Sequence, residues 1–276
     1  VVRLVFVSLS LILLFSGLLG PVLARAQSPK GPHALVMTVD GIINQVKVGF
    51  ISRAINQAQE DGTELLIIQL DTPGGLLSST REIVALLLES PLPVAVFVSP
   101  KGARAGSAGT FITAAGNFAV MAPGTNIGAA TPISSTGEDL DDTLARKVEN
   151  DAAALIESIA DVRGRNVEKL VETVRSAASY AAQEALADNV VDIIAQDLDD
   201  LLAQIDGLSA NTSAGTVVLE TQGLEIRSLG KNILEHFLEF ISDPNVSFIL
   251  LTVGGLGIMV ELFNPGLIAP GVVGVI

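Results

Sequence analysis

Cysteine, tryptophan and clusters of basic residues are all missing from this sequence of 276 residues. Because acidic residues outnumber lysine and arginine, the formal net charge is −14 at pH 7. Nucleic-acid binding depends on clustered lysine and arginine that contact phosphates, so this composition argues against a nucleic-acid partner. The absence of cysteine excludes disulfide bonds, and it is compatible with an exported protein without establishing one.

Long apolar runs occur near the two ends of the chain. Arg3 precedes an apolar run over residues 4–19, and small residues at 24–26 form a typical cleavage site. These features predict a secretory signal peptide over residues 1–26, with an uncleaved anchor helix as the alternative. Residues 247–276 predict the start of a transmembrane region that continues beyond the last residue. The part between is therefore expected to be extracytoplasmic, on the periplasmic or outer face.

Short apolar strands alternate with amphipathic helices between these ends. This pattern predicts a parallel sheet that is covered on both faces, within one globular domain over residues 33–207. The strands are expected at 34–39, 64–71, 93–99, 118–122 and 190–195, and the helices at 45–62, 75–90, from 107 onward, and at 139–162, 166–175, 180–189 and 197–205.

The segment 208–246 is expected to connect this domain to the membrane. Serine, asparagine and glycine between 207 and 215 indicate a linker. Alternating residues over 216–230, with Gln222 and Gly223 as a turn, predict a small hairpin. Residues 231–244 are amphipathic and predict a helix that leads into the membrane.

Two glycine-containing turns follow neighbouring strands, where active sites of α/β proteins gather. In "LDTPGGLL", Gly74 and Gly75 can present bare backbone N–H groups to an anion, although an ordinary turn explains the same pair. In "GARAGSAGTFITAAG", Ser107 lies among small residues at the start of a helix. Ser107 is either a nucleophile or a simple helix N-cap.

A nucleophilic serine needs a base, and histidine is scarce. His33 precedes the first expected strand and His236 lies near the membrane segment. Neither position is suited to reach the end of the third strand, which argues against a Ser-His-Asp triad. Lysine is the usual substitute. The six lysines are Lys30, Lys47, Lys101, Lys147, Lys169 and Lys231.

Lys147 is the favoured base. On the helix expected over 139–162, positions 140, 144, 147, 151, 155 and 158 share one largely apolar side. Burial there would lower the lysine pKa and supply a neutral amine. The alternative is a surface lysine paired with Asp151 one turn later, which would raise the pKa. Lys101 is the rival, but it follows Pro100 at a strand end and is expected to face water.

Three motifs occur in the order "LDTPGG", "GARAGSAGTFI" and "MAPGTNIGAATPI", and a lysine-bearing helix follows them. Together they resemble the protease domain of the NfeD family. The members of this family are membrane-bound serine proteases of the ClpP class. The resemblance runs from residue 34 to 207 and continues into "DPNVSFILL" and "FNPGLIAPGVVG". It implies an α/β fold of the ClpP/crotonase type, a β-superhelix of ββα units with surrounding helices. The acidic stretch "GEDLDDTLARKVEND" departs from the less charged, Pro-rich family pattern, so the register of this helix decides whether Lys147 meets Ser107.

The resemblance also implies roles. Ser107 is the expected nucleophile and Lys147 the base; Gly74 and Gly75 are the oxyanion donors, with the Ala108 amide as a helper. No cofactor or metal is expected.

The implied substrate is an apolar peptide or membrane protein, the partner a stomatin-like membrane protein, and the assembly a homodimer or higher oligomer. Three other functions stay open. They are a catalytically inactive scaffold that partners a stomatin-like protein, a signal-peptide-peptidase-like protease, and a crotonase-type acyl-CoA enzyme, against which export and the Ser-Lys pair argue.

Overall fold

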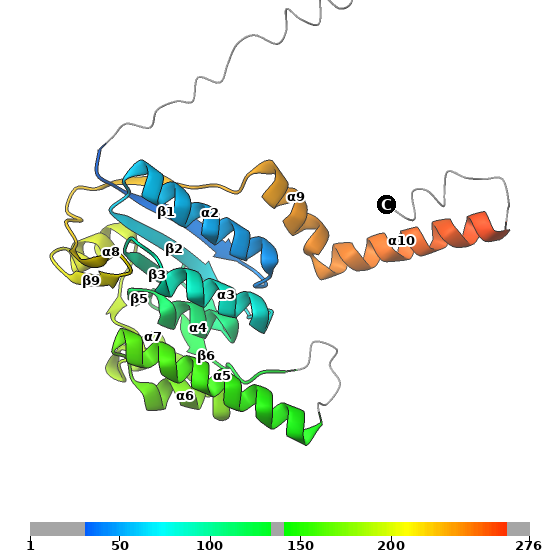
Figure 1. The fold of residues 1–276 in the computed structure, drawn as a ribbon, viewed down its shortest axis with the longest axis horizontal. Helices are drawn as coiled ribbons and strands as arrows, with labels where there is room; N and C mark the ends of the chain where they lie inside the picture. The colour runs from blue at the N-terminus through cyan, green and yellow to red at the C-terminus, as the bar shows by residue number, and fades with distance from the viewer. Residues whose placement is uncertain (1–30, 134–140, 264–276) are drawn as a thin grey trace, which may run out of the picture. The chain divides into compact units, whose positions relative to one another are not determined.

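The computed structural model describes residues 31–133 and 141–263, which form the fold shown in Figure 1. The predicted signal peptide over residues 1–26 and the end of the predicted membrane region lie outside the described residues.

A six-stranded sheet forms the centre of the fold, and all its neighbouring strands are parallel. The strand order is β11-β1-β2-β3-β5-β8. These strands are Glu225–Ser228, His33–Asp40, Leu65–Asp71, Val94–Val98, Phe118–Met121 and Ile193–Ile194. The parallel sheet predicted from the continuous apolar strands is confirmed.

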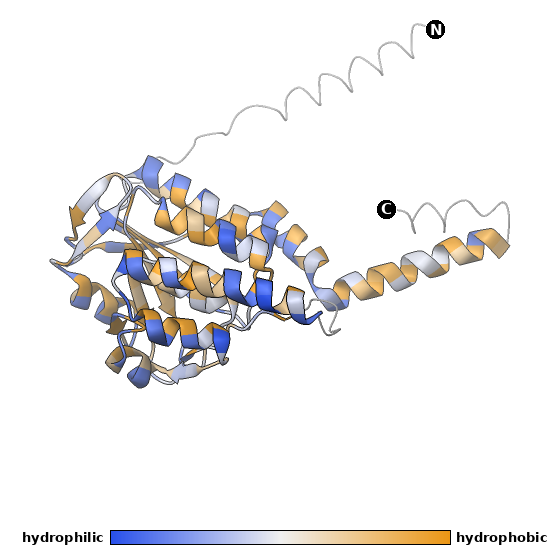
Figure 2. Cartoon of the chain, turned by 60° about the horizontal axis from the view of Figure 1, so that its bottom comes forward, coloured by the Kyte–Doolittle hydropathy of each residue, from blue (hydrophilic) through white to orange (hydrophobic). Residues whose placement is uncertain are grey.

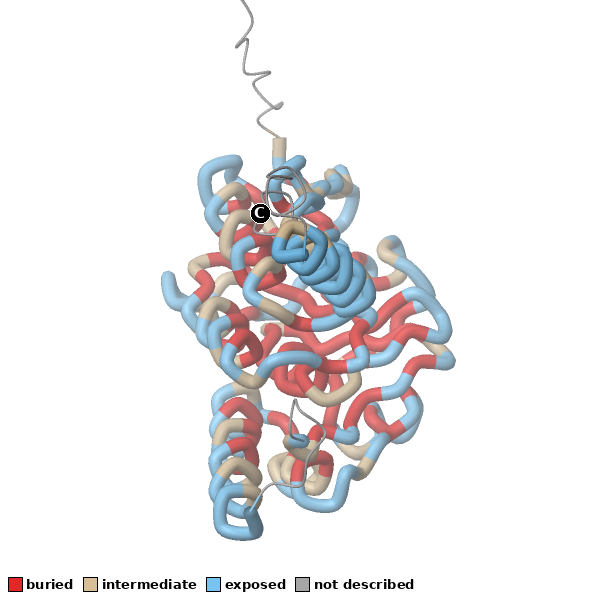
Figure 3. Tube along the Cα trace, turned by 90° about the vertical axis from the view of Figure 1, so that its right-hand side faces the viewer, coloured by how far each residue is buried: buried red, intermediate tan, exposed pale blue. Residues whose placement is uncertain are grey.

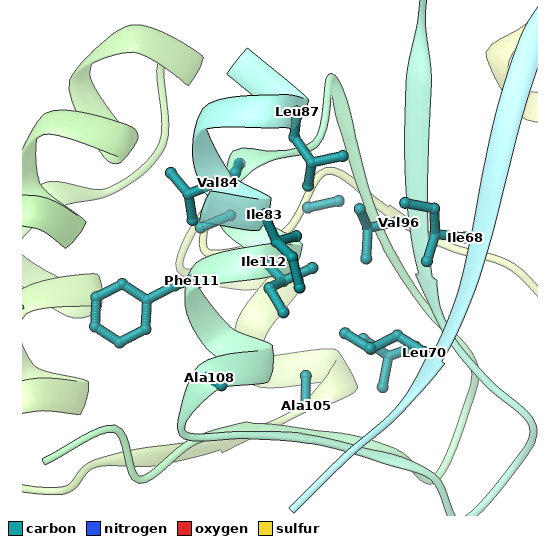
Figure 4. Close-up of a cluster of buried hydrophobic side chains, with 14 of the residues drawn as sticks. Ile68, Leu70, Ile83, Val84, Leu87, Val96, Ala105, Ala108, Phe111 and Ile112 are labelled. Atoms are coloured by element: carbon teal, nitrogen blue, oxygen red, sulfur yellow. The ribbon is translucent and has the colours of Figure 1, made fainter. Parts of the chain in front are cut away.

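The two faces of this sheet are covered by different elements. Ile68 and Val96 face a core built with α2, α3, α4 and α5. Figure 4 shows side chains of α3 and α4 that point towards these strands. Ile67 and Phe97, one residue away in each strand, face the opposite core with α8. The helices are α2 Gln45–Asp61, α3 Leu77–Leu88, α4 Ala108–Ala115, α5 Asp142–Arg163, α6 Val167–Arg175, α7 Ala182–Ala187 and α8 Leu198–Ile205.

A second, three-stranded sheet was not predicted. It consists of β4 (Arg104–Gly106), β6 (Asn126–Gly128) and β7 (Ser179–Ala181), in the order β4-β6-β7. β3 and β4 precede α4, and β5 and β6 precede α5, so each pair contributes one strand to each sheet. This is the ββα repeat of the predicted superhelix. Each new strand has only three residues, which is too short for a hydrophobic alternation to be visible in the sequence.

The hairpin predicted over 216–230 is wrong. The antiparallel pair consists of β9 (Ser209–Thr212) and β10 (Gly215–Val218), so the hairpin begins within the predicted linker and only its second strand extends into the predicted segment. β11 instead pairs in parallel with β1 at the edge of the main sheet. Alternation indicated strands correctly, but a distant strand edge, rather than the nearest turn, supplies the hydrogen bonds of β11.

Two helices complete the described chain: α9 (Ile233–Ser242) and α10 (Pro244–Phe263). α10 has 20 residues and a mean hydropathy of 2.1, and none of its apolar window is buried. Within the described ranges it is the one helix long and apolar enough to cross a membrane. Figure 2 shows this predominance of hydrophobic residues along α10.

Ion pairs attach α9 to α2 and β1. The Arg53 guanidinium on α2 donates to both carboxylate oxygens of Glu235 on α9, with nitrogen–oxygen distances of 2.7 Å. Glu235 also closes a capping box with Asn232 at the start of α9. This single carboxylate therefore stabilises the start of the helix and fixes it to the domain.

A second group of ion pairs lies one turn along α9. Lys231 Nζ lies 2.7 Å from Glu239 Oε2 and 3.0 Å from Asp40 Oδ1. Lys47, which is 2% exposed, also pairs with Glu239. We call the six residues of both groups the α9 clasp: Asp40, Lys47, Arg53, Lys231, Glu235 and Glu239.

The clasp is expected to weaken in acid. The hydrogen bond from Arg53 lowers the pKa of Glu235. Burial acts to raise the pKa of Glu239 and Asp40, but hydrogen bonds and charges of the neighbouring lysines outweigh it, so both pKa values are also lowered. A carboxyl group with a lowered folded-state pKa stabilises the fold above its ordinary pKa, and this stability is lost as the pH falls through the folded value.

We therefore predict that α9 detaches from the domain when the pH falls below 4.5, the ordinary pKa of a glutamate side chain. The rest of the domain should unfold only at a lower pH. Hydrogen-exchange protection factors, compared at about pH 7 and about pH 3, test this. The matched control is α4, which contains no ionisable side chain. Protection should fall in α9 and persist in α4; an equal fall in both would contradict the prediction.

Candidate active site

Ser107 occupies a strained turn between β4 and α4. Its φ of 49° and ψ of −108° are rare for a residue with a side chain. Ser107 stands at the N-cap position of α4, yet its side chain makes no capping hydrogen bond. An N-cap serine normally has an extended backbone and accepts such a bond. The helix-cap explanation of this serine therefore fails, and its half-buried hydroxyl is not used by the helix.

Neighbouring backbone groups hold this strained conformation. The Ser107 N–H donates to the Gly128 carbonyl oxygen at 2.9 Å, and the Thr110 N–H donates to the Ser107 carbonyl oxygen at 2.9 Å. The buried Thr110 hydroxyl lies 3.0 Å from the Ala105 carbonyl oxygen and 3.2 Å from that of Gly128. Strain of this kind persists only where the surroundings impose it, and it is frequent at active sites.

The loop with Gly74 and Gly75 lies directly against Ser107. A β-carbon added at Gly74 would lie 2.8 Å from the Ser107 Cβ and 3.3 Å from its Oγ. Gly74 also has a φ of +128°, which side-chain-bearing residues rarely adopt. The structure thus brings together the two glycine-containing motifs that are separated by about thirty residues in the sequence.

Position 75 also requires a glycine, because a third segment of the chain approaches it equally closely. It forms a parallel β-bridge with Ile43, and an added β-carbon would lie 2.1 Å from the Ile43 carbonyl oxygen. The Ile43 N–H bonds to the Gly74 carbonyl, and the Leu76 N–H bonds to the Ile43 carbonyl. In a parallel ladder, the N–H of the intervening residue points to the other side. The N–H of Gly75, an exposed residue, therefore faces away from Ile43.

The predicted oxyanion donors differ in their availability. The Gly74 N–H donates to the Thr72 hydroxyl at 3.0 Å, so it already has an acceptor. Within the described part of the chain, neither the Gly75 N–H nor the Ala108 N–H has an acceptor. Ala108 directly follows Ser107 at the first position of α4, where a free backbone N–H is normal. Gly75 and Ala108 are therefore the two amides that can receive an anion.

The predicted apolar stripe with Lys147 is not buried, which corrects that prediction. Lys147 and Asp151 are exposed, and Leu144 is 48% exposed. The buried residues of α5 all lie later in the helix: Ala152, Ala153, Ile156, Ile159 and Ala160. Figure 3 shows α5 exposed or partly exposed along its first turns.

The direction of α5 explains this exposure. At its end, the Arg163 guanidinium donates to the carbonyl oxygens of Ala115, at the end of α4, and Leu87, in the last turn of α3. From Arg163 back to Lys147 the helix spans about 24 Å, whereas the eight residues of α4 span about 12 Å. The first turns of α5 therefore extend past the start of α4, where little of the domain can cover them.

Asp151 does not pair with Lys147, contrary to the alternative considered from the sequence. It forms an ion pair with Arg81 on α3. Because α3 begins directly after the Gly74–Gly75 loop, this pair directs the first half of α5 towards the end of the domain where Ser107 lies. Lys147 is on that half, one turn before Asp151, but no described contact connects it to Ser107.

The deeply buried lysine is Lys47, which the sequence interpretation did not select. Burial lowers the pKa of Lys47, although its pairing with Glu239 opposes this effect. Its spacing relative to Ile51, Ala54 and Ala58 places it on the buried side of α2, and this signal was available in the sequence. Lys47 belongs to the α9 clasp rather than to the serine site. Lys101 is exposed, as predicted.

Sequence comparison connects the chain with two families of domains. Residues 33–213 match the model described as NfeD1b, N-terminal domain, and residues 245–276 match the NfeD integral membrane domain. The chain is 34% identical over 246 residues to the membrane-bound protease PH1510 of Pyrococcus horikoshii, covering 87% of this chain and 55% of the relative. It is 28% identical over 253 residues to the membrane protein NfeD1b of Bacillus subtilis, covering 87% and 53%. The chain thus spans about half the length of these relatives.

Structure comparison gives a ClpP-like fold. The membrane-bound stomatin-specific protease 1510-N, as a Lys→Ala mutant in complex with a substrate peptide, is 32% identical with a TM-score of 0.71, covering 77% of this chain and 98% of that chain. Its Ser→Ala mutant is 32% identical with a TM-score of 0.68, covering 73% and 99%. ClpP1 from Listeria monocytogenes, 18% identical with a TM-score of 0.50 over 60% of this chain and 94% of that chain, shares the fold alone.

The close contact at Gly75 generates a stability prediction. Gly75→Ala forces the Ile43 segment to move, and we expect a loss of about 1–3 kcal/mol of unfolding free energy. Gly49→Ala is the matched control, because Gly49 is an exposed helical glycine with nothing within 4 Å of an added β-carbon. That change should be neutral or stabilising by up to about 1 kcal/mol. Thermal unfolding of both variants checks this, and equal melting temperatures would refute it.

Proposed function

The chain belongs to the NfeD1b family, and we propose that it is a membrane-anchored serine endopeptidase with Ser107 as nucleophile and Lys147 as base. The protease domain extends over residues 33–207 and lies outside the cytoplasm. The observation that carries the proposal is the strained turn at Ser107, whose hydroxyl makes no helix cap and lies against Gly74. A serine held in this way is exposed to a substrate for attack.

The oxyanion of the tetrahedral intermediate binds to backbone amides beside Ser107. The free N–H groups of Gly75 and Ala108 are the principal donors, and the start of α4 adds a favourable dipole. Gly74 has a mainly steric role in this site, because its N–H is bonded to the Thr72 hydroxyl. It donates to the oxyanion only if that bond breaks.

Lys147 in its neutral form accepts the Ser107 Oγ proton as Oγ bonds to the peptide carbonyl carbon. It then donates this proton to the departing amine, and the acyl-enzyme remains. Lys147 next removes a proton from water as the water oxygen bonds to the ester carbon. It returns this proton to Ser107 Oγ as the bond between Oγ and the carbonyl carbon breaks, which releases the carboxylic acid and restores the serine hydroxyl and the neutral lysine. Two findings support the pairing of Ser107 with Lys147. The Arg81–Asp151 contact directs α5 towards this end of the domain. The two mutants of 1510-N replace a serine and a lysine whose separation along the chain is almost the same as that of Ser107 and Lys147.

The base is assembled when the first turns of α5 pack against the domain. These turns are exposed in the single chain, so they have room to close on a bound peptide or on a second copy of the chain. Removal of water from around Lys147 in that complex would favour the neutral amine that a general base needs. We therefore include a homodimer or higher homo-oligomer in the proposal.

The proposed substrate is an apolar segment of a membrane protein, with a stomatin-like protein as partner and substrate. The relative 1510-N is described as specific for a stomatin homologue, which supports this choice for a domain of the same family. The membrane domain at residues 245–276 would hold the site close to membrane-bound substrates.

A catalytically inactive scaffold is the second candidate, and the exposure of Lys147 favours it. In that case the same domain would bind a stomatin-like protein without cutting it. A signal-peptide-peptidase-like activity differs from the first proposal only in the substrate.

We predict that Ser107→Ala and Lys147→Ala each reduce peptide cleavage by at least about 1,000-fold. Cleavage of a fluorogenic apolar peptide by the detergent-solubilised protein measures this. Lys101→Ala, an exposed lysine near the same end of the sheet, is the control and should retain full activity. Absence of fluorophosphonate labelling at Ser107 in the parent protein, together with no cleavage of any peptide, would favour the scaffold; full activity of Lys147→Ala would exclude the dyad.

We also predict selective cleavage within an apolar segment of a stomatin-like protein. Mass spectrometry of the products from a set of overlapping peptides locates the cut site. The Ser107→Ala variant should bind the same peptide without cutting it. Equal cleavage of charged and apolar peptides of the same length would contradict the proposed specificity.

A further inference from the structure

α9 presents its charged side to the domain. Glu235 and Glu239 lie one turn apart on the same side of this helix. Glu235 is nearly buried against Arg53, and Glu239 contacts Lys47 and Lys231. This is the reverse of an ordinary surface helix, which turns its apolar side inwards and its charges towards water.

The opposite side of α9 is apolar and exposed. On a helical wheel with 100° per residue, the apolar residues of α9 fall within an arc, and the centre of this arc lies about 160° from the two carboxylates. Four of them are strongly exposed: Ile233 at 89%, Leu234 at 63%, Phe237 at 58% and Phe240 at 60%. Leu238 and Ile241, at the side of the same arc, are partly buried.

We infer that α9 is an interfacial helix whose apolar face binds the lipid bilayer while the α9 clasp holds the domain on its other side. Helices of this kind lie in the plane of the membrane, with the apolar side at the boundary between headgroups and acyl chains. The proposal commits to lipid as the occupant of the face formed by Ile233, Leu234, Phe237 and Phe240.

Continuity with the membrane domain favours lipid over a protein partner. Only Asp243 separates the end of α9 from Pro244, the first residue of α10. The match to the NfeD integral membrane domain begins at residue 245. The last residue of α9 thus lies two positions before a helix that can span the membrane. This short connection holds α9 at the level of the headgroups, where its apolar face contacts lipid.

The clasp connects this lipid contact to the strand end near the serine. Asp40 and Lys47 precede and follow Ile43, which pairs with Gly75. Because Lys47 is buried and paired with Glu239, the attachment of α9 is part of the packing of α2 rather than a loose surface contact. The lipid-facing helix and the Gly75 loop are therefore held by neighbouring residues of one segment.

The absence of cysteine permits a direct test with single-cysteine variants of the full chain. Phe237→Cys carries a nitrobenzoxadiazole fluorophore, and the protein is reconstituted into phosphatidylcholine vesicles with or without doxyl-labelled lipid. His236→Cys is the matched control: it is adjacent and exposed, but its side chain points about 120° from the centre of the apolar arc. Phe240→Cys repeats the measurement at a second apolar position.

We expect doxyl lipid to quench the labels at 237 and 240 at least about threefold more than the label at 236, with a blue-shifted emission. Equal, weak quenching at all three positions would overturn the proposal. Shielding of position 237 without lipid quenching, together with disulfide crosslinking of the unlabelled Phe237→Cys variant, would also overturn it and assign this face to a second copy. Neither result depends on proteolytic activity, so the proposed function is tested separately.

Discussion

The candidate site depends on the close approach of three backbone segments that leave no room for side chains. The loop after β1 meets the loop after β2 at Ile43 and Gly75, and the loop after β2 meets the β4–α4 turn at Gly74 and Ser107. A single methyl group at either glycine would collide with the neighbouring segment. This packing imposes the strained backbone of Ser107 and turns the free Gly75 amide away from the ladder. The positions of the proposed nucleophile and of the proposed anion donors are therefore consequences of the same contacts.

Local features of this site could be predicted from the sequence. The sequence predicted four apolar strands and a helix that begins at a serine among small residues. The structure has β1, β2, β3, β5 and α4 close to the predicted positions. The glycine pair after β2 marked a turn at the correct sheet edge. The sequence could not decide whether Ser107 is a simple helix cap, because N-cap and nucleophile use the same residue type; its positive φ and missing cap bond exclude the ordinary N-cap role.

Features that depend on distant contacts were missed. β11 pairs with β1, 192 residues earlier, and no local pattern reveals that partner. Helical periodicity identified one side of α5 but could not show that its first turns extend beyond the domain, which leaves Lys147 exposed. The same periodicity, applied to α2, would have revealed Lys47 as the buried lysine. Its acidic partner Glu239 lies on a helix whose inward side carries the charges, which inverts the usual pattern.

The central claim is that the Gly75 and Ala108 amides and Lys147 converge on one peptide carbonyl beside Ser107. An experimental structure of the Ser107→Ala variant with a bound apolar peptide tests it most directly. The account predicts the scissile carbonyl oxygen within about 3.1 Å of both amide nitrogens. It also predicts that the Lys147 Nζ lies close enough for a hydrogen bond of about 2.6–3.2 Å to a hydroxyl restored at residue 107. A peptide bound with its carbonyl directed away from these amides, or with Lys147 still in solvent, would contradict it.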